Sequence, residues 1–496
     1  MEFNHIMSIT SSVEYRSRTY IDVALFLVLF LLSLCFVYFL PQAFSRIFFL
    51  LLLALFLLSK KDYFWFAFFF VLAQGPGYFF SDYSGLSLQR LPLYTFAAGM
   101  SFTPIDIFVF LALVKALMKG RRTKLKLEKP LLALLGYIVF SIFVTSLIFG
   151  TSIDVIAWNV RWIFYYSIII SFLSLLNKKH DIYNFAILVF PFVFFILFTQ
   201  IYFVVTGNEF INIFNPEFRW IAMNSVTGAL RPVMGGVLIL FFAFVFALLM
   251  LGGEKYSLPR IYLYLVMSVS FLSVFLSATR LWFVIFSVVL LGYILVSRKK
   301  FLSSVGIVAI FCVVLSTLLY FGVIPLDFLI TSSWGRLYQV FNILRGDVYA
   351  IDTARNRLLN QLPVIVDTIR QNPFLGYGFS FTTMASYDND FGFLNTILLF
   401  GINGFLLFLF FFFRLFATLS GATRNLSSRN PYRTMLKILI VAWLGVLIGY
   451  FTTWDFFTYY SQKVFFISIL IAISEFTVRH SRSVESSLEM SGIRPT

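Results

Sequence analysis

Long apolar runs recur along the whole chain, and they constrain its fold more than any other feature of the sequence. Val23 to Leu40, Leu131 to Phe149 and Ile261 to Leu276 are examples. Each approaches or matches the roughly 20 residues that cross a hydrocarbon core as an α-helix. Because the runs are continuous, and do not alternate in polarity over segments of about 10 residues, they favour helices over membrane strands. The sequence therefore predicts an all-α integral membrane protein.

Composition supports a multispanning chain. Of the 496 residues, 60% are hydrophobic and only 12% are charged, which leaves too little polar surface for a soluble protein of this size. The first run is long and further runs follow at once, so it is predicted to be a retained signal anchor. Window length predicts a bundle of about 14 helices, over residues 22–40, 43–58, 63–79, 103–118, 130–149, 161–176, 184–205, 232–251, 261–277, 281–297, 302–322, 391–413, 434–452 and 463–477.

Basic residues gather on alternate connections, and they predict the topology. They lie at Lys60-Lys61, Lys115 to Lys129, Lys178-Lys179, Lys255 and Arg260, Arg298 to Lys300, and Arg414 to Lys437. Connections rich in lysine and arginine face the cytoplasm, so both termini are predicted to lie there too. The net charge of +16 then falls on the cytoplasmic side. We therefore interpret this charge as a signal of membrane topology, and we expect no nucleic-acid partner.

Five segments follow from this topology. They are a cytoplasmic N-terminal segment 1–20, transmembrane helices 1–11 over 21–322, a long extracytoplasmic loop 323–390, transmembrane helices 12–14 over 391–478, and a cytoplasmic tail 479–496.

The predicted outer face is biased toward arginine. Its basic residues, apart from Lys463, are arginines 46, 90, 161, 219, 231, 280, 336, 345, 355, 357 and 370. Arginine holds phosphate oxygens with two parallel hydrogen bonds, whereas lysine acts as a point charge. Each arginine alone could pair with a carboxylate or a lipid headgroup. Together they favour an anionic ligand.

The outer loop of roughly 65 to 70 residues is long for a connection without a role. Residues 354–370 carry an apolar stripe that predicts an amphipathic helix on the bundle or on the membrane surface. Asn372-Pro373 is expected to end this helix. Gly376-Tyr377-Gly378 then predicts a turn whose backbone approaches another group closely.

Several kinds of chemistry find no support in the sequence. There is no Walker A motif and no metal-ligand spacing, so neither a metal nor a cofactor is expected. The histidines, His5, His180 and His480, all fall on the predicted cytoplasmic side. No Asp, Glu, Lys or Arg is predicted near the centre of a span, which disfavours ion-coupled transport.

Two arginines stand at predicted helix starts on the outer side. Arg231 precedes Pro232 and a glycine pair, and proline suits the first turn of a helix. Arg280 ends the short turn Ser277-Ala278-Thr279-Arg280. Backbone N–H groups at a helix start favour an anion beside the guanidinium, although either arginine could instead anchor the chain at the lipid boundary.

The order of motifs from Arg231 to Arg414 resembles the O-antigen ligase and polymerase superfamily of bacterial surface-polysaccharide assembly. The resemblance is carried by Arg231, by the turn at Arg280, by the long outer loop and by the motifs that follow it. Those motifs read Asn372-Pro373-Phe374-Leu375-Gly376-Tyr377-Gly378, Asp388-Asn389-Asp390-Phe391-Gly392-Phe393-Leu394-Asn395 and Gly401-Ile402-Asn403-Gly404.

The resemblance implies a glycosyltransferase with a GT-C-like fold that needs no metal and no nucleotide sugar. Such enzymes transfer a glycan from undecaprenyl pyrophosphate to an acceptor hydroxyl at the outer face of the bacterial inner membrane. Arg231 and Arg280 match arginines that hold the donor pyrophosphate. Gly376, Tyr377 and Gly378 match a substrate-binding turn. A chain-length regulator protein and membrane lipid are the implied partners, besides the lipid-linked donor and acceptor.

One departure from the family pattern bears on the reaction. Ligases of the superfamily carry a histidine after the glycine turn, where this chain has Asp388-Asn389-Asp390. The departure favours a polymerase of undecaprenyl-pyrophosphate-linked repeat units, as in O-antigen and lipopolysaccharide biosynthesis. Asp388 or Asp390 could accept the hydroxyl proton, or could cap the next helix.

Arg355 and Arg357 are then expected to hold the second lipid-linked substrate. The rival functions are a ligase that transfers glycan to the lipid A core and, in another class, a flippase for lipid-linked oligosaccharides.

Overall fold

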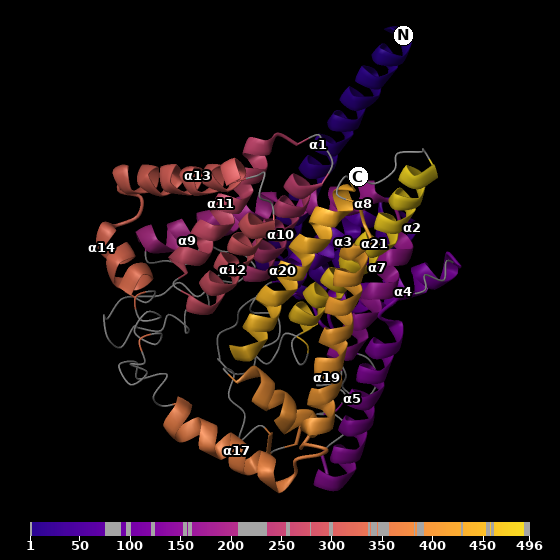
Figure 1. Cartoon of the computed structure of the whole chain (residues 1–496), viewed down its shortest axis with the longest axis vertical. Coiled ribbons are helices and arrows are strands. Elements are labelled where there is room, and N and C mark those ends of the chain that lie inside the picture. The colour runs from indigo at the N-terminus through magenta and orange to yellow at the C-terminus, as the bar shows by residue number, and fades with distance from the viewer. Residues whose placement is uncertain are drawn as a thin grey trace.

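The computed structural model describes residues 2–74, 91–95, 101–120, 125–151, 156, 161–206, 236–253, 258–277, 279–296, 301–335, 338, 345, 357–380, 382–383, 391–427, 430–452, 457 and 461–490. Helices dominate this part of the chain (Figure 1). The longer ones are α1 (Glu2–Tyr38), α2 (Gln42–Leu58), α3 (Asp62–Ala73), α4 (Pro104–Met118), α5 (Glu128–Phe149), α7 (Ser167–Leu175), α8 (Lys179–Val189), α9 (Pro191–Thr206), α10 (Val237–Gly252), α11 (Arg260–Leu276), α12 (Arg280–Val296), α13 (Phe301–Tyr320), α17 (Leu362–Gln371), α19 (Gly392–Arg424), α20 (Pro431–Thr452) and α21 (Ser461–Met490).

Short elements complete the described fold. They are the 3-10 helix η3 (Arg161–Tyr166), the helix α14 (Leu326–Phe328), the π-helices η6 (Leu329–Trp334) and η8 (Arg357–Gln361), and the strands β1 (Tyr94–Thr95) and β2 (Ser101–Phe102). The two strands pair in antiparallel orientation, with Tyr94 opposite Phe102.

Six helices of the described chain are long and apolar enough to cross a membrane. They are Thr19–Tyr38, Glu128–Phe149, Lys179–Thr206, Gly392–Arg424, Pro431–Phe451 and Ser461–Ser486. Seven shorter apolar helices accompany them. The expected all-α, membrane-type fold class is confirmed at this level, while the number of about 14 spans remains a prediction.

Phenylalanine and leucine are the commonest side chains in the interior of the described structure. Helix α10 is apolar on all sides and almost completely buried, as a helix at the centre of a bundle must be. The rings meet edge to face, for example Phe66 with Phe172 at 5.4 Å between centroids and Phe70 with Phe465 at 5.8 Å. This geometry favours the aromatic quadrupoles and joins α3, α7 and α21.

Helices α12 and α20 pack closely through glycines. A Cβ atom at Gly445 would lie 3.0 Å from the Val289 side chain and 3.1 Å from that of Ile285. Gly292 lies against Val441 in the same way. Small residues allow helix backbones to approach in a membrane bundle, and this pairing places the start of α12 beside the end of α20.

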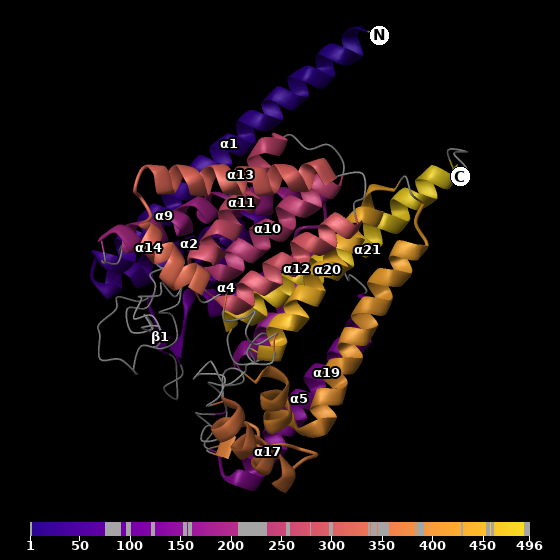
Figure 2. The same ribbon diagram turned by 60° about the vertical axis from the view of Figure 1, so that its left-hand side comes forward.

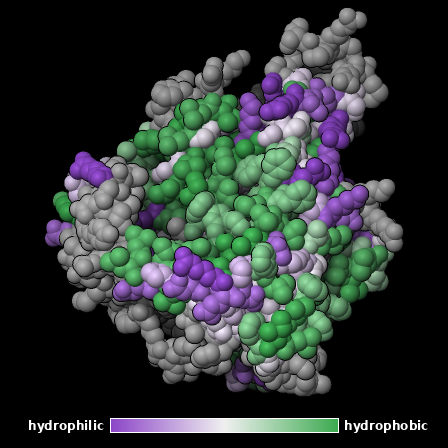
Figure 3. Space-filling model, turned by 60° about the horizontal axis from the view of Figure 1, so that its bottom comes forward, coloured by the Kyte–Doolittle hydropathy of each residue, from purple (hydrophilic) through white to green (hydrophobic). Residues whose placement is uncertain are grey.

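The molecule has two chemically different ends along its long axis. Figures 1 and 2 show the N- and C-termini toward one end, and α17 at the other, with α5 and α19 running together toward α17. We call the first the basic end, because Lys61 pairs with Asp22 of α1 and Lys126 lies near Arg479 and Arg482 of α21. We call the second the turn end. In Figure 3 the turn end is tilted toward the viewer, and a band of hydrophilic residues crosses a mainly hydrophobic surface.

Candidate functional site

Helix α19 is broken at Gly401, near the turn end. The backbone of Gly401 has φ 69° and ψ −178°, a conformation that is essentially restricted to glycine. A short helical half precedes it and a longer half follows. Breaks of this kind are tolerated in membrane helices only where the freed backbone groups find partners inside the protein.

The turn formed by residues 372–380 supplies these partners. It lies in the break, and its backbone replaces hydrogen bonds that a continuous helix would make within itself. Three backbone bonds join the two segments: Tyr377 N–H to Leu398 O at 2.8 Å, Gly378 N–H to Leu399 O at 2.9 Å, and Ile402 N–H to Pro373 O at 2.7 Å.

Glycine is required in the turn because the approach is so close. Gly376 and Gly378 have φ of 71° and 54°. A Cβ atom at Gly376 would lie 2.6 Å from the Gly401 nitrogen, and one at Gly378 would overlap the Thr145 hydroxyl of α5. The close approach expected from the sequence is therefore made to the protein's own helices. Substrate binding by these residues remains a prediction.

Tyr377 lies between the two glycines and is 6% exposed. Its hydroxyl donates to the carbonyl of Thr368 at 3.2 Å, which ties the turn to α17. Burial raises the pKa of this phenol, so it stays neutral and keeps its donor proton. Asn372 adds a second local bond through its side-chain amide, which donates to the carbonyl of Gly376 at 2.5 Å.

One face of α5 holds the turn through side chains that the sequence analysis missed. Their contacts are Tyr137 hydroxyl to Phe400 O at 3.0 Å and Phe374 O at 3.3 Å, and Ser141 Oγ to Leu375 O at 3.1 Å. Tyr137, Ser141 and Thr145 recur every four residues in an apolar run, and this spacing places them on one helix face. That pattern was the available signal.

Two motifs distant in sequence thus meet in space. The Asn372 to Gly378 motif and the Gly401 to Gly404 motif, both used for the family resemblance, form one interlocked unit. Gly404 contributes by leaving room for the Tyr137 ring, whose Cε1 would lie 3.1 Å from a Cβ atom there.

Arg280 is the first residue of α12 and is half-buried. The Ser277 hydroxyl before it donates to the Val274 carbonyl at 2.7 Å and lies 3.0 Å from the Thr279 hydroxyl, so local hydrogen bonds shape the turn. The positive end of the α12 dipole and the guanidinium lie together there, which favours an anion.

The start of α12, with Arg280, is connected to the break in α19 through helix α20. The start of α12 lies beside the end of α20, and the hydroxyl of Tyr450 near that end is hydrogen-bonded to Thr396 of α19. Since Thr396 precedes the break by little more than one helical turn, α20 connects the two features.

The other predicted site residues fall in different places. Arg357 begins η8 and is half-buried, next to α17. Arg231, Arg355, Asp388 and Asp390 lie outside the described residues, so their roles remain predictions.

Two arginines of the predicted outer set have carboxylate partners. Arg370 lies 3.1 Å from Asp367 on the exposed side of α17. Arg161 lies 3.4 Å from Asp106, and their side chains are 10% and 5% exposed. Asp106 also accepts from the Tyr165 hydroxyl at 2.8 Å, so this pair belongs to an internal network. Pairing of single arginines with carboxylates was the alternative to anion binding, and it holds for these two.

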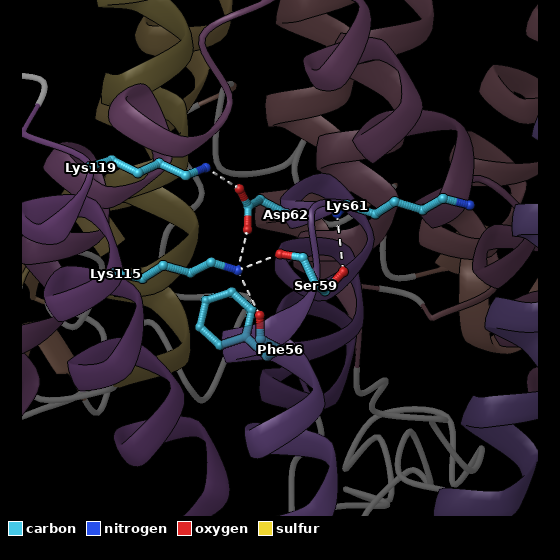
Figure 4. A network of polar contacts seen from close by, with 6 residues as sticks. All are labelled: Phe56, Ser59, Lys61, Asp62, Lys115 and Lys119. Atoms are coloured by element: carbon cyan, nitrogen blue, oxygen red, sulfur yellow. Dashed lines mark hydrogen bonds and ion pairs between the residues drawn. The ribbon is translucent and has the colours of Figure 1, made fainter.

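The basic end is stabilised by a buried ion network, shown in Figure 4. Asp62 is 2.8 Å from Lys115 and 2.7 Å from Lys119. The Lys115 ammonium also donates to the carbonyls of Phe56 and Ser59 at 2.6 and 2.7 Å, where α2 ends. The Lys115 ammonium thus has two carbonyl acceptors and a carboxylate at ion-pair distance, and a buried charge requires such partners.

Glu475 lies midway along the long helix α21 and is only 1% exposed. Its carboxylate accepts from the N–H groups of Leu127 and Lys126 at 2.8 and 3.2 Å. It thus caps the start of α5 at the basic end.

The described residues contain no group of three His, Cys, Asp or Glu side chains that could hold a metal ion. Comparison with known proteins adds no identification, since no family model and no curated protein matches the chain.

Proposed function

We propose that the protein is a membrane glycosyltransferase that polymerises undecaprenyl-pyrophosphate-linked oligosaccharide repeat units. In this proposal the turn end faces the outside of the bacterial cytoplasmic membrane, and both termini face the cytoplasm. The product is O-antigen or a related surface polysaccharide.

One observation carries the proposal. Two motifs of the resemblance, 372–378 and 401–404, interlock at a broken membrane helix, and α20 packs against both this helix and the helix that begins at Arg280. The agreement between sequence order and spatial grouping supports a common site.

The chemistry requires a stabilised leaving group and an acceptor for one proton. The acceptor hydroxyl oxygen bonds to the anomeric carbon of the donor sugar, while the bond from that carbon to the pyrophosphate oxygen breaks. Arg280, with Arg231, stabilises the charge that develops on the departing pyrophosphate. The hydroxyl proton passes to Asp388 or Asp390. Arg355 and Arg357 hold the second lipid-linked substrate.

A strain that lacks the protein tests the proposal by its glycan pattern. Loss of polymerisation predicts a single repeat unit attached to the lipid A core. Loss of all attached glycan would instead indicate a ligase. Repeat units that accumulate on the cytoplasmic side would indicate a flippase, and an unchanged pattern would exclude all three functions.

A further inference from the structure

At the break in α19, backbone groups form hydrogen bonds with the turn in place of the hydrogen bonds that they would form within a continuous helix. In a continuous helix the N–H of Ile402 would donate to Leu398 O, four residues earlier. Here Leu398 O accepts from Tyr377 instead, and the Ile402 N–H donates to Pro373 O. The same polar groups therefore have two alternative sets of partners.

These alternative partners define two states of α19, one broken with the turn in place and one continuous without it. Intermediates between the two states are unfavourable. If the turn left the break, the freed carbonyls and the Ile402 N–H would lack partners unless α19 closed into a continuous helix. An unsatisfied buried group is costly, and Gly401 can adopt helical angles as readily as its present ones. The turn is therefore either seated in a broken helix or displaced from a closed one.

Tyr137 contacts the turn and both halves of α19, which lie together when the turn occupies the break. Its hydroxyl lies 3.3 Å from Phe374 O in the turn and 3.0 Å from Phe400 O at the end of the first helical half. Its ring also lies beside Gly404 in the second half, where a Cβ atom would be 3.1 Å from Tyr137 Cε1. Closing the helix would move Phe400 and Gly404 relative to each other, so the Tyr137 contacts favour the broken form.

We propose that Tyr137 is a positioning residue that keeps the turn seated in the break of α19. Through the turn it also positions α17 and η8, because Tyr377 bonds to Thr368 of α17 and Arg357 begins η8. Its importance for glycan transfer rests on the proposed function, whereas its effect on the turn does not.

Ser380 offers a probe of the seated state that needs no activity. Its side chain is 3% exposed, and its hydroxyl has no hydrogen-bond partner in the described structure. Ser380→Cys is therefore a small change that should be tolerated. Cys35 and Cys312 are exposed and are first replaced by alanine, so that a water-soluble maleimide reports on position 380 alone.

Tyr137→Phe removes only the hydroxyl and is expected to raise the labelling rate of the thiol at position 380 about fivefold, the effect of one typical hydrogen bond. Tyr183→Phe is the matched control, because Tyr183 is buried at the basic end and its hydroxyl lies 3.9 Å from the Met435 sulfur. This control should leave labelling unchanged.

A second reporter separates local displacement from general loosening. Ser468 lies at 0% exposure in α21, and its hydroxyl likewise has no partner among the described residues. Labelling of Ser468→Cys should not respond to Tyr137→Phe. Equal labelling at position 380 with and without the Tyr137 hydroxyl, or an equal rise at position 468, would overturn the proposal.

Polymer formation by the same variants tests the link to transfer. Tyr137→Phe is expected to shorten the product ladder, and Tyr183→Phe to leave it unchanged. Faster labelling with a full ladder would refute the positioning role in transfer. If the unaltered protein made no ladder, the proposed function would fail, and labelling would still decide whether Tyr137 holds the turn.

Discussion

Single backbone positions decide how the turn end is built. Gly401 has angles that other residues rarely adopt, and Gly376 lies where a side chain would collide with it. The sequence pointed to these glycines as turn-forming or motif residues. It could not indicate that they approach each other, because 25 residues of chain separate them and nothing local specifies the partner of a close approach.

Gly401→Ala tests the requirement for glycine at the break. The substitution should cost about 1 to 3 kcal/mol through backbone strain alone, and more through overlap of its Cβ with the Phe374 carbonyl. We expect a lower melting temperature of the detergent-solubilised protein. Gly421→Ala in the same helix is the control, since a Cβ there meets open space and alanine favours helix. Equal stability of the two variants would contradict the assigned geometry.

The sequence predicted only some residues of the candidate site, and individual residues show why. Arg280 was found because a charge at the start of an apolar helix is conspicuous. Tyr137 and Ser141 were missed because one tyrosine and one serine in an apolar run are ordinary, and only their bonds to the turn reveal a role. Arg161 was grouped with ligand-binding arginines because its partner Asp106 is 55 residues away in sequence.

At the scale of elements, helix α17 is seated mainly through one side chain. Ile365 is completely buried, whereas its neighbour Val364 is 51% exposed. Ile365 was not part of the expected apolar stripe, of which Leu358 and Leu359 are exposed and Leu362, Val366 and Ile369 are half-buried. The polar side of α17 carries Asp367 and Arg370 outward.

Ile365→Ala is predicted to loosen α17. Removing this buried side chain should cost about 2 to 5 kcal/mol, enough to release a helix with few other buried groups. Limited proteolysis should then cut within residues 357–371 faster than in the unaltered protein. Val364→Ala should cleave at the normal rate. Comparable cleavage of both variants would argue against the docking of α17 through Ile365.

Ion pairs at the basic end should differ in strength according to burial. Lys115→Met removes the ammonium that donates to the carbonyls of Phe56 and Ser59 and one partner of buried Asp62, which should cost about 3 kcal/mol. Lys61→Met removes a pair whose lysine is 57% exposed, and should cost about 0 to 1 kcal/mol. Thermal unfolding in detergent measures the difference. A larger loss of stability for Lys61→Met than for Lys115→Met would contradict the predicted order of the two ion pairs.

At the scale of the whole molecule, helix positions followed well from apolar run length. The prediction of residues 103–118 corresponds to Pro104–Met118, and 130–149 to Glu128–Phe149. The last helix was placed too short, because the polar residues after Phe476 do not interrupt helical propensity and the described helix continues to Met490. Hydropathy marks where a helix can enter lipid, and it does not mark where the helix ends.

The charge difference between the ends predicts a membrane orientation. In the cysteine-free background, Arg370→Cys at the turn end should react with an impermeant maleimide added outside intact spheroplasts. Lys60→Cys at the basic end should react only after the membrane is opened. Both positions are exposed, so the difference reports sidedness. The opposite pattern would place the candidate site in the cytoplasm, where no lipid-linked repeat is polymerised under this proposal.

The proposed function depends on guanidinium groups that hold a lipid-borne pyrophosphate, and purified protein supplied with undecaprenyl-pyrophosphate repeat units measures this most directly. The unaltered protein should give a ladder of products. Arg280→Ala should reduce it by about a hundredfold or more, as loss of a charge-stabilising group does, and Arg280→Lys should restore part of it through its point charge. A full ladder from folded Arg280→Ala protein would contradict the proposal.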